Sequence, residues 1–182
     1  MAKAVVFFAE GTEECEALLV VDLLRRAKVE VLVASASGSR EILSSHKVHI
    51  TADALAEEVD YSDVDLVVLP GGIPGTPNLA ANKTVTDTCV SFAKAGKKVA
   101  AICAAPTVLA KAGLLEGKKA VCYPGMEEQL TGAKVSFDPV AVDGTVITSR
   151  GLGTAIPFAL SIVQYFEGQE CAKALASSVV YR

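Results

Sequence analysis

Short apolar runs alternate with longer amphipathic segments along most of this 182-residue chain. The apolar, partly β-branched runs predict strands at residues 3–9, 29–35, 65–69 and 98–102. Each run is followed by a turn signal and a segment with helical periodicity. Strands that are apolar on both faces and alternate with helices are typical of a parallel sheet covered on both sides. The pattern therefore predicts a doubly wound α/β fold.

Apolar residues spaced three and four apart predict helices at residues 14–27, 78–95, 104–112, 153–167 (closed by Gly168) and 169–178. Two other segments, 39–50 and 135–148, show short alternating stretches, and Asp143-Gly144 in the second is a strong hairpin signal. We expect both segments to be small antiparallel additions at the sheet edges. Without repeats or linkers, residues 1–182 are expected to form a single domain.

Composition narrows the classes of partner. The net charge is −4, with 21 acidic and 17 basic residues and no block of like charge, so nucleic acid and anionic membrane are poor candidates. The first apolar run is too short for a signal-peptide core, and no run is long enough to cross a bilayer. We therefore expect a soluble, cytoplasmic protein.

The five cysteines form an odd set without a CxxC pair, which predicts neither a disulfide framework nor a thiolate zinc site: Cys15, Cys89, Cys103, Cys122 and Cys171. Four lie inside apolar or helical stretches, where a small buried thiol is the usual explanation. Cys103 instead lies where a strand passes into a helix, with Pro106 in the first helical turn. This is the geometry of a nucleophile elbow, although the flanking glycines are missing. A helix N-terminus would favour a reactive thiolate; the alternative is a buried structural thiol.

Glu16 is in phase with the apolar face of the first predicted helix, which it shares with Leu19, Val20, Leu23, Leu24 and Ala27. A carboxylate on a buried face is costly unless it is paired or protonated, so its pKa is expected to rise. A protonated carboxyl could then donate a hydrogen bond to a thiolate at Cys103. The alternative is that Glu13, Glu14 and Glu16 only occupy a helix N-terminus, where acidic residues are favoured.

The opposite side of the same helix carries Leu18 and Val21 near Glu14 and Arg25. This side is too apolar for free solvent, and we predict a subunit interface there.

The loop Pro70-Gly71-Gly72 follows a predicted strand, and adjacent glycines leave backbone amides uncovered. The Gly72 and Ala104 N–H groups could together form an oxyanion hole for a tetrahedral intermediate. A plain tight turn is the alternative reading of the two glycines.

Three stretches together resemble the ThiJ/PfpI superfamily: Glu16 after a Gly-Thr-Glu-Glu turn, Val-Leu-Pro-Gly-Gly-Ile-Pro-Gly at 68–75, and Ala-Ala-Ile-Cys-Ala-Ala-Pro at 100–106. A fourth, Thr-Ser-Arg-Gly-Leu-Gly-Thr at 148–154, is similar to the branch of the Parkinson-disease-associated protein deglycase and its bacterial relatives. The motifs cover nearly the whole chain in the same order. The resemblance is therefore specific.

The resemblance implies a flavodoxin-like sandwich that forms a homodimer through helix 14–27. It assigns Cys103 as nucleophile and oxidisable thiol, Glu16 as its protonated partner, and Gly72, Ala104 and the adjacent Gly71 to substrate or oxyanion binding. Members of this branch are described as cofactor-independent glyoxalases and deglycases acting on methylglyoxal or its early adducts, as oxidative-stress sensors and as chaperones.

Two departures from the family pattern bear on chemistry. Protease-like branches have a histidine directly after the cysteine, where this chain has Ala104, so a Cys-His peptidase loses its general base. Relatives often place a histidine near the pocket where this chain has Tyr123, which can donate a hydrogen bond but is a weak base at neutral pH. Proton transfer is then expected to fall mainly to Glu16.

The remaining family positions imply supporting roles. His46 aligns with a loop residue that reaches the partner's pocket, and His49 is expected at the surface. Two histidines with no third ligand do not make a metal site, and no cofactor is expected. Ser149 and Arg150 are expected to support the cysteine loop, and Leu152 replaces the family's proline.

The leading hypothesis is an enzyme for small α-oxoaldehydes in which Cys103 attacks the aldehyde and Glu16 moves a proton between adjacent carbons. The main rival is a redox sensor in which Cys103 becomes a sulfinic acid. A chaperone is the third class. The chain has no Walker loop or dinucleotide fingerprint, so the doubly wound fold does not predict nucleotide binding.

Overall fold

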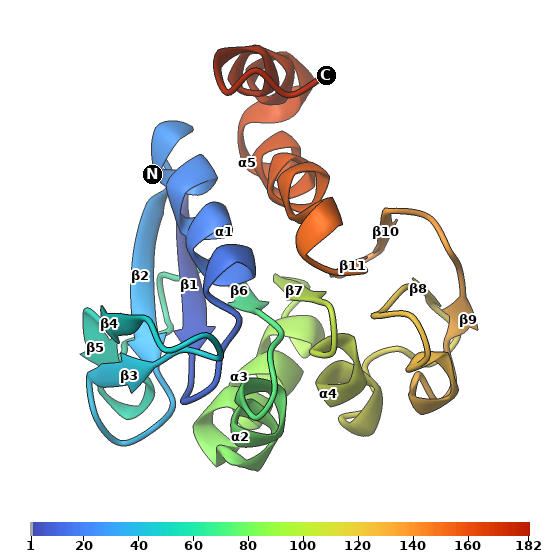
Figure 1. Cartoon of the computed structure of the whole chain (residues 1–182). Helices are drawn as coiled ribbons and strands as arrows, with labels where there is room; N and C mark the ends of the chain where they lie inside the picture. Colours follow the sequence, from blue (N-terminus) through green and yellow to red (C-terminus); the bar gives the residue numbers. More distant parts are fainter. Residues whose placement is uncertain (1) are drawn as a thin grey trace.

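Seven strands form one mostly parallel sheet in the computed structural model, which describes residues 2–182 (Figure 1). Their order across the sheet is β10-β11-β7-β6-β1-β2-β5. The inner strands are all parallel: β1 (Lys3–Phe8), β2 (Glu30–Ser35), β6 (Leu66–Leu69), β7 (Lys98–Ile102) and β11 (Val146–Ser149). At the edges, β5 (Ala54–Leu55) pairs parallel and β10 (Val140–Asp143) pairs antiparallel. The predicted α/β class and the four predicted strands are confirmed.

Helices cover both faces of this sheet (Figure 1). Helices α1 (Glu14–Arg26) and α5 (Ala155–Ser178) cover one face, and the other carries α2 (Gly75–Ala81), α3 (Lys83–Lys94) and α4 (Pro106–Lys111). Because side chains alternate along a strand, Val6 and Phe8 of β1 pack into the α1–α5 layer, whereas Val5 and Phe7 pack into the layer opposite. This double burial explains why the strand sequences are apolar throughout.

Three predicted helices have different boundaries in the structure. The helix expected at 78–95 is two helices, because the Asn82 side chain accepts the Val85 N–H at 3.1 Å and caps the start of α3. The helix expected at 104–112 begins only at Pro106, so Ala104 lies in the preceding turn. Gly168, with φ of 85°, interrupts α5 where the sequence predicted an end.

The antiparallel additions are only partly as predicted. Segment 39–50 forms a separate hairpin, β3 (Glu41–Leu43) with β4 (His49–Thr51), and does not extend the main sheet. Segment 135–148 supplies the expected edge strand β10, but β11 lies inside the sheet beside β7.

The remaining short elements were not predicted from the sequence: parallel strands β8 (Lys119–Ala120) and β9 (Lys134–Val135), and 3-10 turns η1 (Ala56–Glu58), η2 (Glu127–Gln129) and η3 (Leu152–Thr154). Two-residue strands and single turns leave almost no periodic signal in a sequence. Within residues 2–182, none of the helices has both the length and the apolar character needed to cross a membrane.

The loop after β6 packs directly against the turn between β1 and α1. The Gly75 N–H donates to the Gly11 carbonyl at 3.1 Å, and the Glu13 N–H donates to the Gly71 carbonyl at 2.9 Å. A Cβ at Gly75 would lie 2.6 Å from the Thr12 nitrogen, a distance that real side chains do not tolerate. Glycine is therefore needed here for close approach of two backbones.

We predict that Gly75→Ala lowers the free energy of unfolding by about 2 kcal/mol, because the new methyl group overlaps the Thr12 backbone. Gly153→Ala is the matched control, since neither glycine has a positive φ and a Cβ at Gly153 would meet no other atom of residues 2–182 within 4 Å. It should change stability by less than about 0.5 kcal/mol. Equal losses in chemical denaturation would contradict the steric explanation.

Candidate active site

Cys103 sits on a sharp turn between β7 and α4. Its φ is 65°, a left-handed conformation that is uncommon for residues other than glycine. Two backbone hydrogen bonds fix this geometry: the Cys103 N–H donates to Ser149 at 3.0 Å, and the Cys103 carbonyl accepts from Tyr123 at 2.8 Å. Pro106 is the first residue of the helix that follows. The predicted strand-to-helix elbow is therefore present.

Glu16 lies on the buried face of α1, with only 2% of its surface exposed. Its Oε2 accepts the Gly71 N–H at 3.1 Å. Burial raises the pKa of this carboxyl to about 7, against opposing hydrogen bonds from Cys103 and the Gly71 and Leu152 backbones, and the charge of Glu13 adds to the rise. A substantial share of Glu16 is therefore protonated near neutral pH, as its helical phase predicted.

Gly71 lets Glu16 and Cys103 approach each other. A Cβ at this position would lie 2.6 Å from Cys103 Cβ, 2.6 Å from Glu16 Oε2 and 3.0 Å from Cys103 Sγ. The Gly71 N–H donates to Glu16 and is not available as an oxyanion donor, and a role of Gly71 in substrate binding stays a prediction. Its role is to position the carboxyl and to leave space between the two reactive groups.

The backbone N–H groups of Ala104 and Gly72 both favour a negative charge on the Cys103 sulfur and so lower the pKa of its thiol. Burial and the ionised Glu16 carboxylate raise the pKa of the thiol to about 12, and these two amides lower it only in part. The simple prediction of a thiolate activated by a helix terminus is therefore wrong while Glu16 is charged. When Glu16 carries the proton, its charge no longer opposes a thiolate, so the two groups titrate as a pair.

An open groove of about 310 Å³ lies beside this pair and is lined by Tyr123, Pro124, Arg150, Gly151, Leu152, Gly153 and Thr154. Ser149, at the end of β11, is buried and donates its hydroxyl to the Pro139 carbonyl at 2.8 Å, while its own carbonyl accepts the Cys103 N–H. Arg150 instead places its guanidinium 5.7 Å from the centre of the Phe137 ring and lines the groove. The Tyr123 backbone holds Cys103 while its side chain faces the groove.

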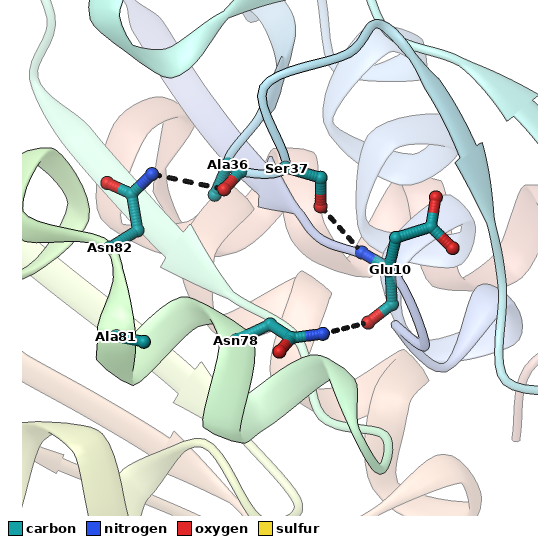
Figure 2. Close-up of a pocket in the computed structure, with 6 residues that line it drawn as sticks. All are labelled: Glu10, Ala36, Ser37, Asn78, Ala81 and Asn82. Carbon is teal, nitrogen blue, oxygen red and sulfur yellow. Dashed lines mark hydrogen bonds between the residues drawn. The ribbon is translucent and has the colours of Figure 1, made fainter.

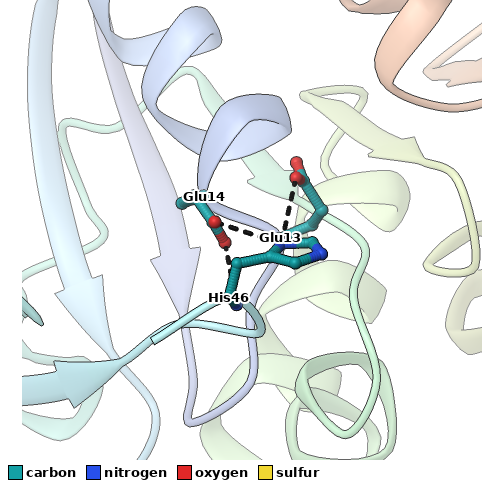
Figure 3. A group of neighbouring side chains, drawn as sticks. All are labelled: Glu13, Glu14 and His46. Carbon is teal, nitrogen blue, oxygen red and sulfur yellow. Dashed lines mark hydrogen bonds and ion pairs between the residues drawn. The ribbon is translucent and has the colours of Figure 1, made fainter. Parts of the chain in front are cut away.

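His46 joins two acidic residues at the start of α1 (Figure 3). Its Nδ1 lies 3.1 Å from Glu14 Oε1 and 3.8 Å from Glu13 Oε1. His46 therefore has two carboxylates beside it, which the sequence did not predict as partners in a metal site. Both carboxylates already have structural partners, however. Glu13 Oε2 accepts the Glu16 N–H at 2.6 Å and caps α1, and Glu14 Oε2 accepts from Ser45 at 3.2 Å. We therefore assign no metal to this cluster.

The pKa values of Glu14 and Glu16 shift in opposite directions. Burial raises the pKa of both carboxyls, but at Glu14 hydrogen bonds outweigh this effect. Its own backbone N–H and the loop of Ser44, His46 and Ser45 lower that pKa to about 2. Glu14 is therefore ionised at all pH values near neutrality.

Two predictions about the surroundings of the site need correction, and a third is confirmed. Val21 is 5% exposed and belongs to the core, so it does not lie on a free surface of α1, whereas Leu18 is 41% exposed. Cys15 was expected to be buried, but the residue is exposed. Partial loss of solvent around its thiol and the charges of the neighbouring carboxylates raise its pKa, which disfavours oxidation through a thiolate. His49 lies on the exposed β4 strand as expected.

A second hollow, of about 410 Å³, lies at the carboxyl ends of β1 and β2 (Figure 2). Asn78 donates to the Glu10 carbonyl at 2.8 Å, Asn82 donates to the Ala36 carbonyl at 3.0 Å, and the Ser37 hydroxyl accepts the Glu10 N–H at 2.8 Å. These groups bind one another across the hollow. They connect α2 and α3 to the strand ends, and we assign no ligand there.

A sequence model of the DJ-1/PfpI family matches residues 2–165. The chain belongs to the DJ-1/PfpI family. The predicted family and its flavodoxin-like fold are thereby confirmed. Within it, the chain is 40% identical to Protein dj-1beta of Drosophila melanogaster over 97% of this chain and 96% of that protein. It is 33% identical to a protein of Caenorhabditis elegans named glutathione-independent glyoxalase DJR-1.2, over 91% of this chain and 89% of that one.

The fold agrees with solved DJ-1 structures. The structure described as oxidized DJ-1 of Toxoplasma gondii superposes with a TM-score of 0.96 at 36% identity, covering 100% of this chain and 99% of that one. Two Arabidopsis thaliana relatives, Protein DJ-1 homologs B and A, are longer: they are 42% and 40% identical over 89% and 94% of this chain, which spans 37% and 44% of their lengths.

We predict that Glu16 makes the protein less stable as pH rises. The folded pKa of about 7 lies above the ordinary value of 4.5, so the folded state keeps its proton while the unfolded chain loses it. Relative to Glu16→Gln, the free energy of unfolding of the wild type should fall by up to about 3 kcal/mol between pH 4.5 and 7. Chemical denaturation across this range measures the difference.

Glu14→Gln is the matched control with the opposite sign. Because the pKa of Glu14 is lowered to about 2, its stabilisation is present above 4.5 and is lost as the pH falls below that value. A wild-type profile with the same pH dependence as Glu16→Gln would contradict the assigned protonation of Glu16.

Proposed function

We propose that this protein is a cofactor-independent glyoxalase that converts small α-oxoaldehydes such as methylglyoxal into hydroxy acids, and that it acts on their early protein adducts by the same chemistry. The observation that carries the proposal is the convergence of one thiol, one protonatable carboxyl and two backbone amides. Cys103, Glu16 and the amides of Gly72 and Ala104 meet at the carboxyl edge of the sheet.

The first step begins with the proton on Glu16 and the negative charge on Cys103. The thiolate attacks the aldehyde carbon and forms the C–S bond of a hemithioacetal. The Gly72 and Ala104 amides stabilise the alkoxide oxygen, which then takes the proton from Glu16. This step leaves Glu16 as a carboxylate beside the C–H bond of the former aldehyde carbon.

In the second step, the Glu16 carboxylate removes the proton from the former aldehyde carbon and returns it to the adjacent carbon, through an enediol. The product is a thioester of Cys103 with a 2-hydroxy acid. The aldehyde carbon is oxidised and the ketone carbon is reduced, so no external redox partner is needed. Water then cleaves the thioester, releasing the hydroxy acid and the thiol.

The name of the Caenorhabditis elegans relative, a glutathione-independent glyoxalase, supports this reaction class. A thiol supplied by the protein could replace that of glutathione, because a hemithioacetal needs only one thiol. Ala104 after the cysteine leaves no imidazole for a Cys-His peptidase, which also favours the proposal.

We predict that Cys103→Ala abolishes conversion of methylglyoxal to lactate, because no other group in the site can form the thioester. Glu16→Gln should lower kcat at least about 100-fold, since general acid–base catalysis typically contributes that much or more. Lactate formation by purified protein is the measurement. Cys171→Ala, at a half-buried cysteine on α5, is the control and should retain wild-type turnover. Lactate formation by the Cys103→Ala variant at the wild-type rate would contradict the proposal.

A second function, sensing of oxidants, is favoured by the amides that act on the Cys103 sulfur and would also stabilise a sulfinate. The structural relative described as oxidized DJ-1 is consistent with this chemistry. Mass spectrometry after mild peroxide treatment separates the two functions. Addition of two oxygens at Cys103 in a protein without measurable glyoxalase turnover would favour sensing.

The proposal includes a homodimer formed through α1. Leu18 is a large apolar side chain that is 41% exposed on this helix. A hollow of about 440 Å³, lined by Leu19 and Leu23, lies between the same helix and α5 with the residues that follow it. Burial of Leu18 against a second copy would remove this apolar surface from water.

We predict a dimeric mass for the wild type by light scattering and a monomeric mass for Leu18→Glu, because the new charge would be buried in the interface. Val142→Glu is the control, since Val142 is 55% exposed on β10, outside α1. A monomeric wild type would contradict the interface.

A further inference from the structure

Large apolar side chains are exposed around the Cys103 site. Ile73 follows Gly72 directly and is 65% exposed, while Tyr123 and Leu152 are each 51% exposed. Tyr123 and Leu152 line the groove beside the Cys103–Glu16 pair. Exposed apolar residues that line one concave surface indicate a binding site more strongly than apolar residues scattered singly.

The groove adjoins Glu16 at Gly151. An added Cβ at Gly151 would lie 3.5 Å from the Tyr123 ring and 3.8 Å from Glu16 Oε1. Gly151 therefore lies next to both the groove and the Glu16 carboxyl. A hydrogen bond from the Leu152 backbone N–H lowers the pKa of that same carboxyl. Tyr123, which lines the groove, also donates its N–H to the Cys103 carbonyl at 2.8 Å, so the groove lies next to the cysteine turn as well.

The groove offers mostly apolar surface to a ligand. The Thr154 hydroxyl, its main polar side chain besides Tyr123 and Arg150, already accepts the Arg150 and Gly151 N–H groups at 3.1 Å each and bonds the Ser149 hydroxyl at 2.7 Å. The Arg150 guanidinium carbon lies 5.7 Å from the centre of the Phe137 ring, and Arg150 brings a flat cation into the groove lining. Flat cations favour aromatic neighbours over aliphatic ones.

The size of the groove does not match the smallest oxoaldehydes. Its volume of about 310 Å³ is in the range of sites for much larger ligands than methylglyoxal, whose only substituent is a methyl group. Methylglyoxal bound at Cys103 would leave Tyr123 and Leu152 without a partner.

We propose that the groove lined by Tyr123, Arg150 and Leu152 is a subsite for an aromatic substituent, and that the preferred substrates are aryl-substituted α-oxoaldehydes. This inference rests on the proposed function, because it names the substrate class of the same site. The ring packs against Leu152 and Tyr123 near the Arg150 guanidinium, while the oxoaldehyde end lies between Cys103 and Glu16. The chemical steps are unchanged, and the product is an aryl hydroxy acid.

The first experiment compares kcat/KM for phenylglyoxal and methylglyoxal in the wild type, Leu152→Ala and Tyr123→Ala. The two aldehydes differ in intrinsic reactivity, so the ratio of their kcat/KM values is compared between proteins, where that difference cancels. We expect the ratio to fall about tenfold in Leu152→Ala, mainly through KM, because the ring loses apolar contact. Val142→Ala, on β10 outside the groove, should keep the wild-type ratio. Ratios within about twofold of wild type in both groove variants would overturn the inference.

The second experiment measures binding without turnover, so that it stays informative if the glyoxalase proposal fails. Mandelate and lactate, the two expected products, are titrated into Cys103→Ala protein by calorimetry. Mandelate should bind about tenfold more tightly than lactate, and Leu152→Ala in the same background should remove most of that difference. Equal binding of the two acids, or no binding of either, would overturn the subsite. Absence of Cys103-dependent turnover with mandelate binding intact would overturn only the proposed reaction.

Discussion

The close approach of Glu16 and Cys103 across Gly71 is the constraint on which the site depends. The two side chains come from α1 and from the end of β7, which are far apart in the sequence. They meet only because residue 71 has no Cβ, since an added one would lie 2.6 Å from both. The Gly71 N–H then fixes the carboxyl. One residue thus provides the space and one of the hydrogen bonds.

This contact makes the carboxyl and the thiol a coupled pair. Burial raises the pKa of Glu16 to about 7, and burial together with the Glu16 charge raises that of Cys103 to about 12. The Cys103 hydrogen bond favours ionisation of Glu16, whereas the Glu16 charge opposes ionisation of Cys103, so the pair carries between one and two protons near neutral pH and one proton above it. The amides of Gly72 and Ala104 stabilise the state in which the sulfur is charged. A pair that shares a proton can serve as both nucleophile and acid without a histidine.

The surrounding fold keeps this arrangement rigid and leaves one side open. The elbow at Cys103 is fixed by backbone bonds to Ser149 and Tyr123, which belong to separate later segments. The same two segments continue into the walls of the apolar groove. The same loops therefore hold the cysteine turn and form the groove that we propose binds the substituent. Tyr123 and Leu152, where the sequence was expected to depart from the family pattern, lie in these loops and line the groove.

Local patterns in the sequence were enough to predict four strands, the parallel sheet and the family, and to place Cys103 at a strand-to-helix junction, because continuous apolar strands and such junctions leave strong local signals. It also placed Glu16, since helical phase is a local property. Only the tertiary structure decided what the Gly71 amide binds, that Val21 is buried, and that His46 meets carboxylates on α1. Each of these depends on packing between segments distant in sequence. The raised thiol pKa is of the same kind, because it arises from burial and from a charge brought in by another helix.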